Sequence, residues 1–273
     1  MYIGIDIGGT HTRVASGAQG KIQQRLDFPT KEFKQGIQDI KEAVQKVSSE
    51  KIERVVIGLP GPIETKTGKL LEPPNLVGWD RVNVADTFSK ILNAQVVVEH
   101  DVSVAALGES LYGAGAGKNP VLYITVSTGI GMGLVVDGKI YKGVYNPEAG
   151  EQILSKAGPT CSCGQESDLE SLSAGSSLKR LTGKDPKDLV GSKAWTDAMD
   201  WLGIGITNSI LHYSPEIVVI GGGLSEAGDR FFDPVRKSVK KHLKILPQVP
   251  IVPAALAPNS GLIGAITLAE TSN

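Results

Sequence analysis

Two apolar segments of the chain end in a turn of glycine, serine and threonine, and each is followed by hairpin-forming sequence and a helical pattern. The first is YIGIDIGGT at residues 2–10, and the second is VLYITVSTGIGMG at residues 121–133. An apolar run that stops at a glycine turn is typical of a buried strand. The repetition lies in the pattern rather than in residue identity. It predicts two α/β lobes with a cleft between them.

Other elements follow from periodicity and turn residues. Apolar residues at helical spacing predict an amphipathic helix over residues 32–48. The runs RVVIGLPG at 54–61 and AQVVVEHD at 94–101 predict buried strands, and Asn83 is placed to cap a helix between them. The Asp-Gly pair in LVVDGKIY predicts a hairpin turn. A long helical pattern around 190–212 precedes the apolar strand PEIVVIGGGLS.

Composition and charge exclude several classes of protein. With 273 residues, 41% of them hydrophobic, the chain is long enough to bury a large core. A formal net charge of -1 does not indicate the excess of positive charge that nucleic-acid binding requires. No apolar run is long enough to span a membrane. Cys161 and Cys163 are too close in sequence for a relaxed disulfide. We therefore expect a cytoplasmic protein without a targeting segment.

Three glycine-rich turns follow buried strands, and each could approach a phosphate group. In DIGGTHTR, Asp6–Arg13, the turn offers backbone N–H groups and a threonine hydroxyl, and Asp6 could hold Mg²⁺ through water. A tight hairpin is the structural alternative. The second turn, STGIGMG, partly matches the GxGxxG pattern of dinucleotide-binding proteins. That pattern requires a helix after the turn, and strand sequence follows here, so we reject the interpretation. The third turn is GGGLS, at residues 221–225.

Together with GLPGPI, PPNLVGW and EHDVSVAALGE, these turns resemble the ROK family (repressor, open reading frame, kinase) of the actin-like ATPase superfamily. The resemblance runs nearly end to end. It implies two ribonuclease-H-like lobes flanking an active-site cleft, one of residues 1–116 plus 258–273 and one of residues 117–257. Because DIGGT begins at residue 6, we expect no DNA-binding domain before it. This favours a kinase over a repressor.

The resemblance also assigns residues to ATP and to the reaction. Asp101 stands where the family has its catalytic aspartate, and a carboxylate there can accept a hydroxyl proton. Because Asp101 precedes a helical pattern, an N-cap is the structural alternative. Asp6 would help to place Mg²⁺. The phosphates and the adenosine would be held by Gly8, Gly9, Thr10, Thr128, Gly129, Gly222 and Gly223.

The sugar-side segments match the family with two departures. Glu148 and Glu170 stand at the positions of its sugar-binding glutamates. His100 replaces the usual asparagine, and an imidazole can substitute for one amide contact but not for both. Glu151 replaces a histidine. The sugar-binding set that the resemblance implies is Gly61, Asn75, His100, Asp101, Glu148, Glu151 and Glu170.

A zinc site of the family is only partly retained. Cys161 and Cys163 match its Cys-x-Cys pair, Asp168 stands in place of a third cysteine, and Glu151 in place of the histidine ligand. Two thiolates and two carboxylates can form a tetrahedral site, but four anions around one dication should bind Zn²⁺ more weakly than Cys₃His. We expect the loop to be held by packing and hydrogen bonds, with Zn²⁺ at these four residues as the alternative.

The sequence therefore predicts an ATP-dependent sugar kinase that phosphorylates a hexose, with O6 of glucose as the first expectation. Fructose, mannose and N-acetylated hexosamines stay open as acceptors, and polyphosphate stays open as a donor. One alternative is a sugar-sensing protein that keeps the fold without catalysis. Another is an actin-like or acetate-kinase-like ATPase, which would not need the sugar-side segments. The resemblance also suggests a homodimer.

Overall fold

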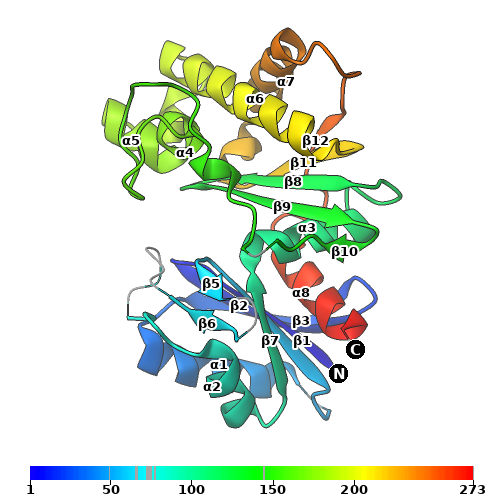
Figure 1. The fold of residues 1–273 in the computed structure, drawn as a ribbon. Coiled ribbons are helices and arrows are strands. Elements are labelled where there is room, and N and C mark those ends of the chain that lie inside the picture. The colour runs from blue at the N-terminus through cyan, green and yellow to red at the C-terminus, as the bar shows by residue number, and fades with distance from the viewer. Residues whose placement is uncertain (49, 65–66, 72–75, 77, 144, 273) are drawn as a thin grey trace.

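The structure, a computed structural model, describes residues 1–48, 50–64, 67–71, 76, 78–143 and 145–272. In this part of the chain two five-stranded sheets are stacked end to end, each with helices around it (Figure 1). A small two-stranded hairpin, β5 (Ile63–Glu64) with β6 (Lys69–Leu70), lies beside the first sheet. No helix among these residues combines the length and hydrophobicity that a membrane span requires.

The first sheet has the strand order β3-β2-β1-β4-β7. Its strands β1, β2 and β3 form an antiparallel meander, and β4 and β7 continue the sheet parallel to β1. The helices α1 and α2 pack against strands β2, β3 and β7 of this sheet. The bounds are β1 Tyr2–Ile7, β2 His11–Ala18, β3 Lys21–Pro29, α1 Phe33–Val47, β4 Arg54–Leu59, α2 Val84–Leu92 and β7 Gln95–His100.

The second sheet repeats this arrangement in the order β10-β9-β8-β11-β12, with an antiparallel meander followed by two parallel strands. The predicted internal repeat is thus confirmed as a repeat of topology. The bounds are β8 Val121–Val126, β9 Ile130–Val136, β10 Lys139–Ile140, η1 Ala149–Glu151, α4 Leu169–Ser173, α5 Gly175–Thr182, η2 Pro186–Leu189, α6 Lys193–Tyr213, β11 Ile217–Gly221, η3 Gly223–Ala227, α7 Asp229–His242 and β12 Ile251–Pro253.

Two helices lie between the sheets (Figure 1). Helix α3 (Asp101–Tyr112) continues directly from β7 but packs against β8 and β9 of the second sheet. Helix α8 (Ser260–Thr271) follows the second sheet in sequence but packs against β1, β2 and β4 of the first. The lobe boundaries at residues 116 and 258 remain a prediction, but the return of the last helix to the first sheet agrees with them.

The alternation of β1 decides which of its side chains faces α8. Ile3, Ile5 and Ile7 are fully buried in the same core as the apolar residues of α1 and α2. Successive side chains of a strand point to opposite faces, so Gly4 and Asp6 face α8. A Cβ atom at Gly4 would lie 2.9 Å from the carbonyl oxygen of Leu262. The glycine therefore lets α8 lie directly on the sheet, close to the carboxylate at the end of β1.

Candidate active site

Asp6 lies at the carboxyl end of β1, beside the first turn of α8. Its Oδ2 accepts a hydrogen bond of 2.8 Å from Nη1 of Arg13, which projects from β2. Burial and the nearby charge of Asp101 raise the pKa of Asp6, although Arg13 opposes the shift. Because burial and like charge both disfavour ionisation, a cation at this place would stabilise the carboxylate. Asp6 thus suits the predicted Mg²⁺ role.

The predicted phosphate turn of Gly8, Gly9 and Thr10 connects β1 to β2 and is largely exposed. The hydroxyl of Thr30 donates to the carbonyl oxygen of Gly8 at 2.6 Å, and the N–H of Thr30 donates to the carbonyl oxygen of Thr10 at 2.9 Å. The end of β3 therefore holds the turn in place, next to Asp6.

Asp101 is the first residue of α3, and His100 precedes the helix. Its Oδ1 accepts a hydrogen bond of 2.7 Å from the N–H of Val102, and 30% of the side chain is exposed. An N-cap carboxylate instead precedes the helix and accepts from its second or third N–H group. The N-cap alternative is therefore wrong in detail, and part of the carboxylate faces solvent, where it can reach a ligand.

The ring of His100 lies between two carboxylates from different lobes. Its Nδ1 is 3.7 Å from Oδ1 of Asp101, and its Nε2 is 4.0 Å from Oε1 of Glu148. A Cβ atom at Gly61 would lie 3.4 Å from Cδ2 of the same ring. Four of the residues predicted to bind sugar thus meet at one point. Asn75, which was predicted to join them, lies outside the described residues.

Glu170 and Glu151 complete an acidic cluster with Glu148. Oε2 of Glu170 accepts a hydrogen bond of 2.8 Å from the N–H of Ile130. Burial raises the pKa of Glu148, and Asp101 and Glu170 raise it further against the opposing effect of His100. Burial, with the charges of Glu148 and Glu170, raises the pKa of Glu151 to about 7. Hydroxyl groups that donate to these carboxylates would lower the electrostatic cost of the cluster.

Three of the four predicted zinc ligands converge in the loop before α4. Single ligand atoms of Cys161, Cys163 and Asp168 lie within 4.8 Å of one another, and no such group among the described residues includes Glu151. The Cys163 thiol donates to Oδ2 of Asp168 at 3.4 Å, while Oδ1 accepts from the N–H of Ser171 at 2.7 Å and caps α4. Burial raises the pKa of Cys161 to about 12, which favours a thiol over the thiolate that a metal needs. The residues present supply three of the four donors of a tetrahedral site.

We expect the protein, purified without added zinc, to contain Zn²⁺ well below one equivalent. We also expect EDTA to leave its melting temperature unchanged, because hydrogen bonds already join the donors. Elemental analysis and thermal melts with and without the chelator test this. An equimolar zinc signal that disappears in Cys161→Ser would contradict it and would establish the zinc alternative.

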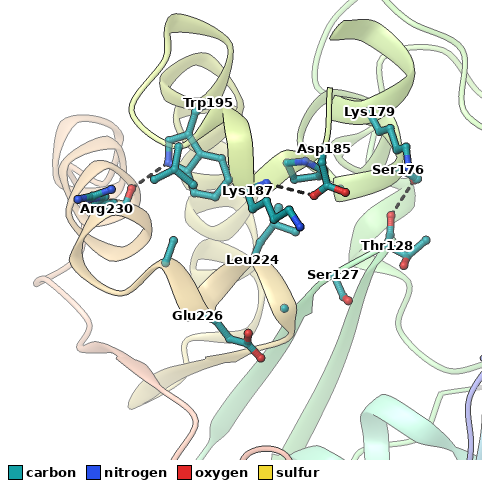
Figure 2. A pocket seen from close by; sticks show the side chains of 15 residues that line it. Ser127, Thr128, Ser176, Lys179, Asp185, Lys187, Trp195, Leu224, Glu226 and Arg230 are labelled. Carbon is teal, nitrogen blue, oxygen red and sulfur yellow. Dashed lines mark hydrogen bonds between the residues drawn. The ribbon is translucent and has the colours of Figure 1, made fainter. Parts of the chain in front are cut away.

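A cavity in the second lobe has a volume of about 710 Å³, within the usual range for small-molecule sites (Figure 2). Three basic side chains and two acidic ones line it beside the ends of β8 and β11, and this excess of positive charge suits an anionic ligand with an apolar part. Its walls are formed by Ser127, Thr128, Gly175, Ser176, Lys179, Asp185, Pro186, Lys187, Val190, Trp195, Gly223, Leu224, Glu226, Ala227 and Arg230.

Two of the predicted nucleotide-binding residues, Thr128 and Gly223, line this cavity. Gly222 precedes Gly223 with φ 90°, and a Cβ atom there would lie 2.5 Å from the carbonyl oxygen of Val126. Its structural role is thus the close approach of β11 to β8. Gly129 instead leaves room for the carboxylate of Glu170, with which a Cβ atom at this position would collide.

The first turn of α5 holds the turn that lines the cavity. The N–H of Gly175 donates to the carbonyl oxygen of Ser127 at 2.8 Å. The hydroxyl of Ser176 donates to the carbonyl oxygen of Thr128 at 2.7 Å (Figure 2). Two residues further on, the N–H of Ile130 holds Glu170. A single short turn therefore connects the cavity to the acidic cluster.

Sequence reasoning missed the far wall of the cavity. Trp195 of α6 donates its indole N–H to the carbonyl oxygen of Arg230 at 2.9 Å (Figure 2). That carbonyl is free to accept because Pro234, four residues on in α7, has no N–H. Pro234, a proline within a helical pattern, is the only sequence signal that we find for this wall, and the tryptophan that uses the free carbonyl comes from an earlier helix. Lys179 and Lys187 carry no such signal.

The two sheets of equal strand order, the helices between them, and a nucleotide-sized cavity beside a carboxylate cluster define a protein of the actin-like ATPase fold. Similar structures are a ROK hexokinase from Thermus thermophilus (28% identity, TM-score 0.88, 98% of this chain and 97% of that one) and a ROK family glucokinase from Streptomyces griseus in complex with glucose and AMPPNP (27%, 0.86, 99% and 99%). Glucokinase from Thermotoga maritima is 29% identical over 97% of this chain and 96% of its own.

The ROK family model matches residues 2–272. The chain belongs to the ROK family.

Proposed function

We propose that the chain is an ATP-dependent hexose kinase that phosphorylates O6 of glucose or of a related hexose, with Asp101 as the base. Membership of the ROK family, with glucokinases and a hexokinase among its relatives, supports the sugar-kinase activity. The observation that carries the residue assignment is the partly exposed carboxylate of Asp101. It lies against His100, whose other ring nitrogen approaches Glu148, while the turn of residues 127–130 links this cluster to the cavity.

Asp101 would accept the proton of the hexose hydroxyl as the bond to the transferred phosphorus forms. Phosphoryl transfer requires little of the protein beyond positioning, charge neutralisation and a base within hydrogen-bond reach. The short bond to the N–H of Val102 fixes one oxygen of Asp101 and leaves the other for the hydroxyl. The rigid start of α3 therefore suits the requirement for a fixed base.

Glu148, Glu170 and His100 would orient the hexose. Carboxylates accept hydrogen bonds from hydroxyl groups, and their crowding here makes such donors favourable. Gly61 leaves room against the ring of His100, and Glu151 and Asn75 belong to the same proposed set. Because His100 and Glu151 depart from the family pattern, we expect the preferred hexose to be decided at these two residues.

ATP would bind in the second-lobe cavity, with its adenosine between α5, α6 and η3 and its phosphates directed along the turn of Thr128 and Gly129 toward the first lobe. Gly222 and Gly223 shape the adenosine end, and Gly8, Gly9 and Thr10 would meet the phosphates from the other side. When bound near Asp6, Mg²⁺ would neutralise charge on the phosphates. Closure of the lobes would exclude water and so limit ATP hydrolysis.

A coupled assay of ADP release with glucose, fructose, mannose and N-acetylhexosamines tests the proposal, with polyphosphate as an alternative donor. We expect ATP-dependent turnover on at least one hexose and a hexose 6-phosphate as product. Absence of turnover on every sugar would contradict it. Sugar binding in calorimetry without ATP binding would then favour a sugar sensor. The homodimer is proposed from the family resemblance alone, and gel filtration with light scattering tests it.

A further inference from the structure

The chain passes between the two sheets at only two places in the described residues. It leaves the first sheet through β7 and α3 and enters β8 after the connection at residues 113–120. It returns from β12 to α8 through the connection at residues 254–259. Any change in the angle between the lobes must therefore be taken up in these two connections and where α3 meets α8.

A single buried carboxylate binds both connections. Glu109 of α3 has no exposed surface. Its Oε2 accepts hydrogen bonds of 3.0 Å from the N–H of Ala114 and 3.0 Å from the N–H of Ala255. Its Oε1 accepts from the N–H of Leu256 at 2.8 Å and from the hydroxyl of Ser260 at 2.7 Å. The carboxylate thus joins the outgoing connection, the returning connection and the start of α8.

The helices that carry these groups cross in backbone contact. A Cβ atom at Gly108 would lie 2.6 Å from the carbonyl oxygen of Ser260, and one at Gly264 would collide with the carbonyl oxygen of Val104. With no side chains separating the two backbones, the crossing has the form of a pivot, and Glu109 lies one residue from it. Short charge-assisted hydrogen bonds are directional, so they resist rotation about such a pivot.

Both carboxylates proposed for the reaction depend on this crossing. Asp101 begins the helix that carries Glu109. A Cβ atom at Gly261, next to Ser260, would lie 3.5 Å from the Asp6 carboxylate. Asp6 lies in β1 and Asp101 directly follows β7 of the same sheet, so a rotation about the crossing would move both carboxylates together relative to the turn of Thr128 in the second lobe.

We propose that Glu109 sets the angle between the two lobes by binding both inter-lobe connections through one carboxylate, and that it thereby positions Asp6 and Asp101 against the turn of Thr128 in the second lobe for phosphoryl transfer. Glu109 is a positioning residue, because Asp101 and Asp6, not Glu109, would face the substrates. The kinetic part of this inference rests on the proposed kinase activity, whereas the statement about the lobe angle does not.

The test compares Glu109→Gln with the wild-type protein by small-angle X-ray scattering without ligands and by steady-state kinetics. The amide keeps the size of the side chain but turns an NH₂ group toward N–H donors. We expect a larger radius of gyration and a kcat lower by about 10²-fold on the hexose that the wild type uses, with KM for ATP unchanged. In a folded variant, a general loss of stability would not lower kcat while leaving KM for ATP unchanged.

Thr267→Val is the matched control. Thr267 is buried on α8, and its hydroxyl donates to the carbonyl oxygen of Ile263 within the same helix. Removing this hydroxyl weakens α8 but leaves the hydrogen bonds between Glu109 and the two connections in place. We expect wild-type scattering and kcat from it. If Glu109→Gln does not fold, the same two measurements are made on Ser260→Ala, which removes one of the four hydrogen-bond donors to Glu109.

A folded Glu109→Gln, or failing that Ser260→Ala, with wild-type scattering and wild-type kcat would overturn the inference. If the wild type phosphorylates no hexose, the proposed function fails, and the scattering comparison alone still decides whether Glu109 sets the lobe angle.

Discussion

Replacing Asp101 by asparagine should lower kcat by about 10²–10⁴-fold, the usual contribution of a positioned general base. Asparagine keeps an oxygen for the N–H of Val102, so the start of α3 should stay intact. KM for ATP should change little, because the cavity that we propose for ATP is formed by residues of the second lobe. Steady-state kinetics with the best hexose, together with circular dichroism to verify folding, measures the effect.

Asp86→Asn is the matched control for this substitution. Asp86 is also a first-turn carboxylate, on α2, and its partner is Asn83 rather than any residue of the cluster. This substitution removes the same charge at a helix N-terminus, which should lower the free energy of unfolding by less than about 1 kcal/mol. It should leave kcat within a factor of about two, because Asp86 does not belong to the cluster. Equal activities of Asp101→Asn and the wild type would remove Asp101 from the reaction.

Replacing Gly264 by alanine should destabilise the fold by about 1–3 kcal/mol or more, the usual cost of overpacking a core. The new methyl group would collide with the carbonyl oxygen of Val104, which is backbone and cannot move aside alone. The helices α3 and α8 would have to separate. Since about 1 kcal/mol corresponds to roughly 2–4 °C in Tm for a chain of 150–250 residues, a loss of several degrees is expected in thermal melts.

Gly261→Ala, on the same helix, provides the comparison. Its Cβ atom would make only ordinary contacts, the nearest at 3.5 Å from the Asp6 carboxylate. Alanine favours helix over glycine by up to about 1 kcal/mol, so Tm should be unchanged or higher. If both variants lost stability equally, backbone contact between α3 and α8 would not explain the result for Gly264.

The two sheets could be predicted because their signals are local. Apolar strands that end at glycine turns, the Asp-Gly hairpin after β9 and the Asn83 cap of α2 each appear in a few consecutive residues. The N–H of Asp86 does donate to Oδ1 of Asn83, as the cap requires. The rejection of a dinucleotide-binding turn at residues 127–133 is also confirmed, because β9 begins at Ile130.

The cavity that we propose for ATP could be predicted only at its edge. Thr128 and Gly223 belong to recognisable turns, but Lys179, Trp195 and Arg230 come from three helices whose packing no local pattern reveals. The hydrogen bonds of Glu109 to the two inter-lobe connections are a second example. Glu109 looks like an ordinary helical glutamate in sequence, and three of its four partners lie about 150 residues further on. Side chains that meet through tertiary packing leave little trace in a single sequence.

A crystal structure with glucose and AMPPNP bound together tests the central claim most directly. The account predicts a carboxylate oxygen of Asp101 within hydrogen-bond distance of the hexose hydroxyl that faces the terminal phosphate, with Glu148 and Glu170 on other hydroxyls of the same ring. A hexose bound elsewhere, or an Asp101 side chain directed away from the sugar in the closed complex, would contradict it.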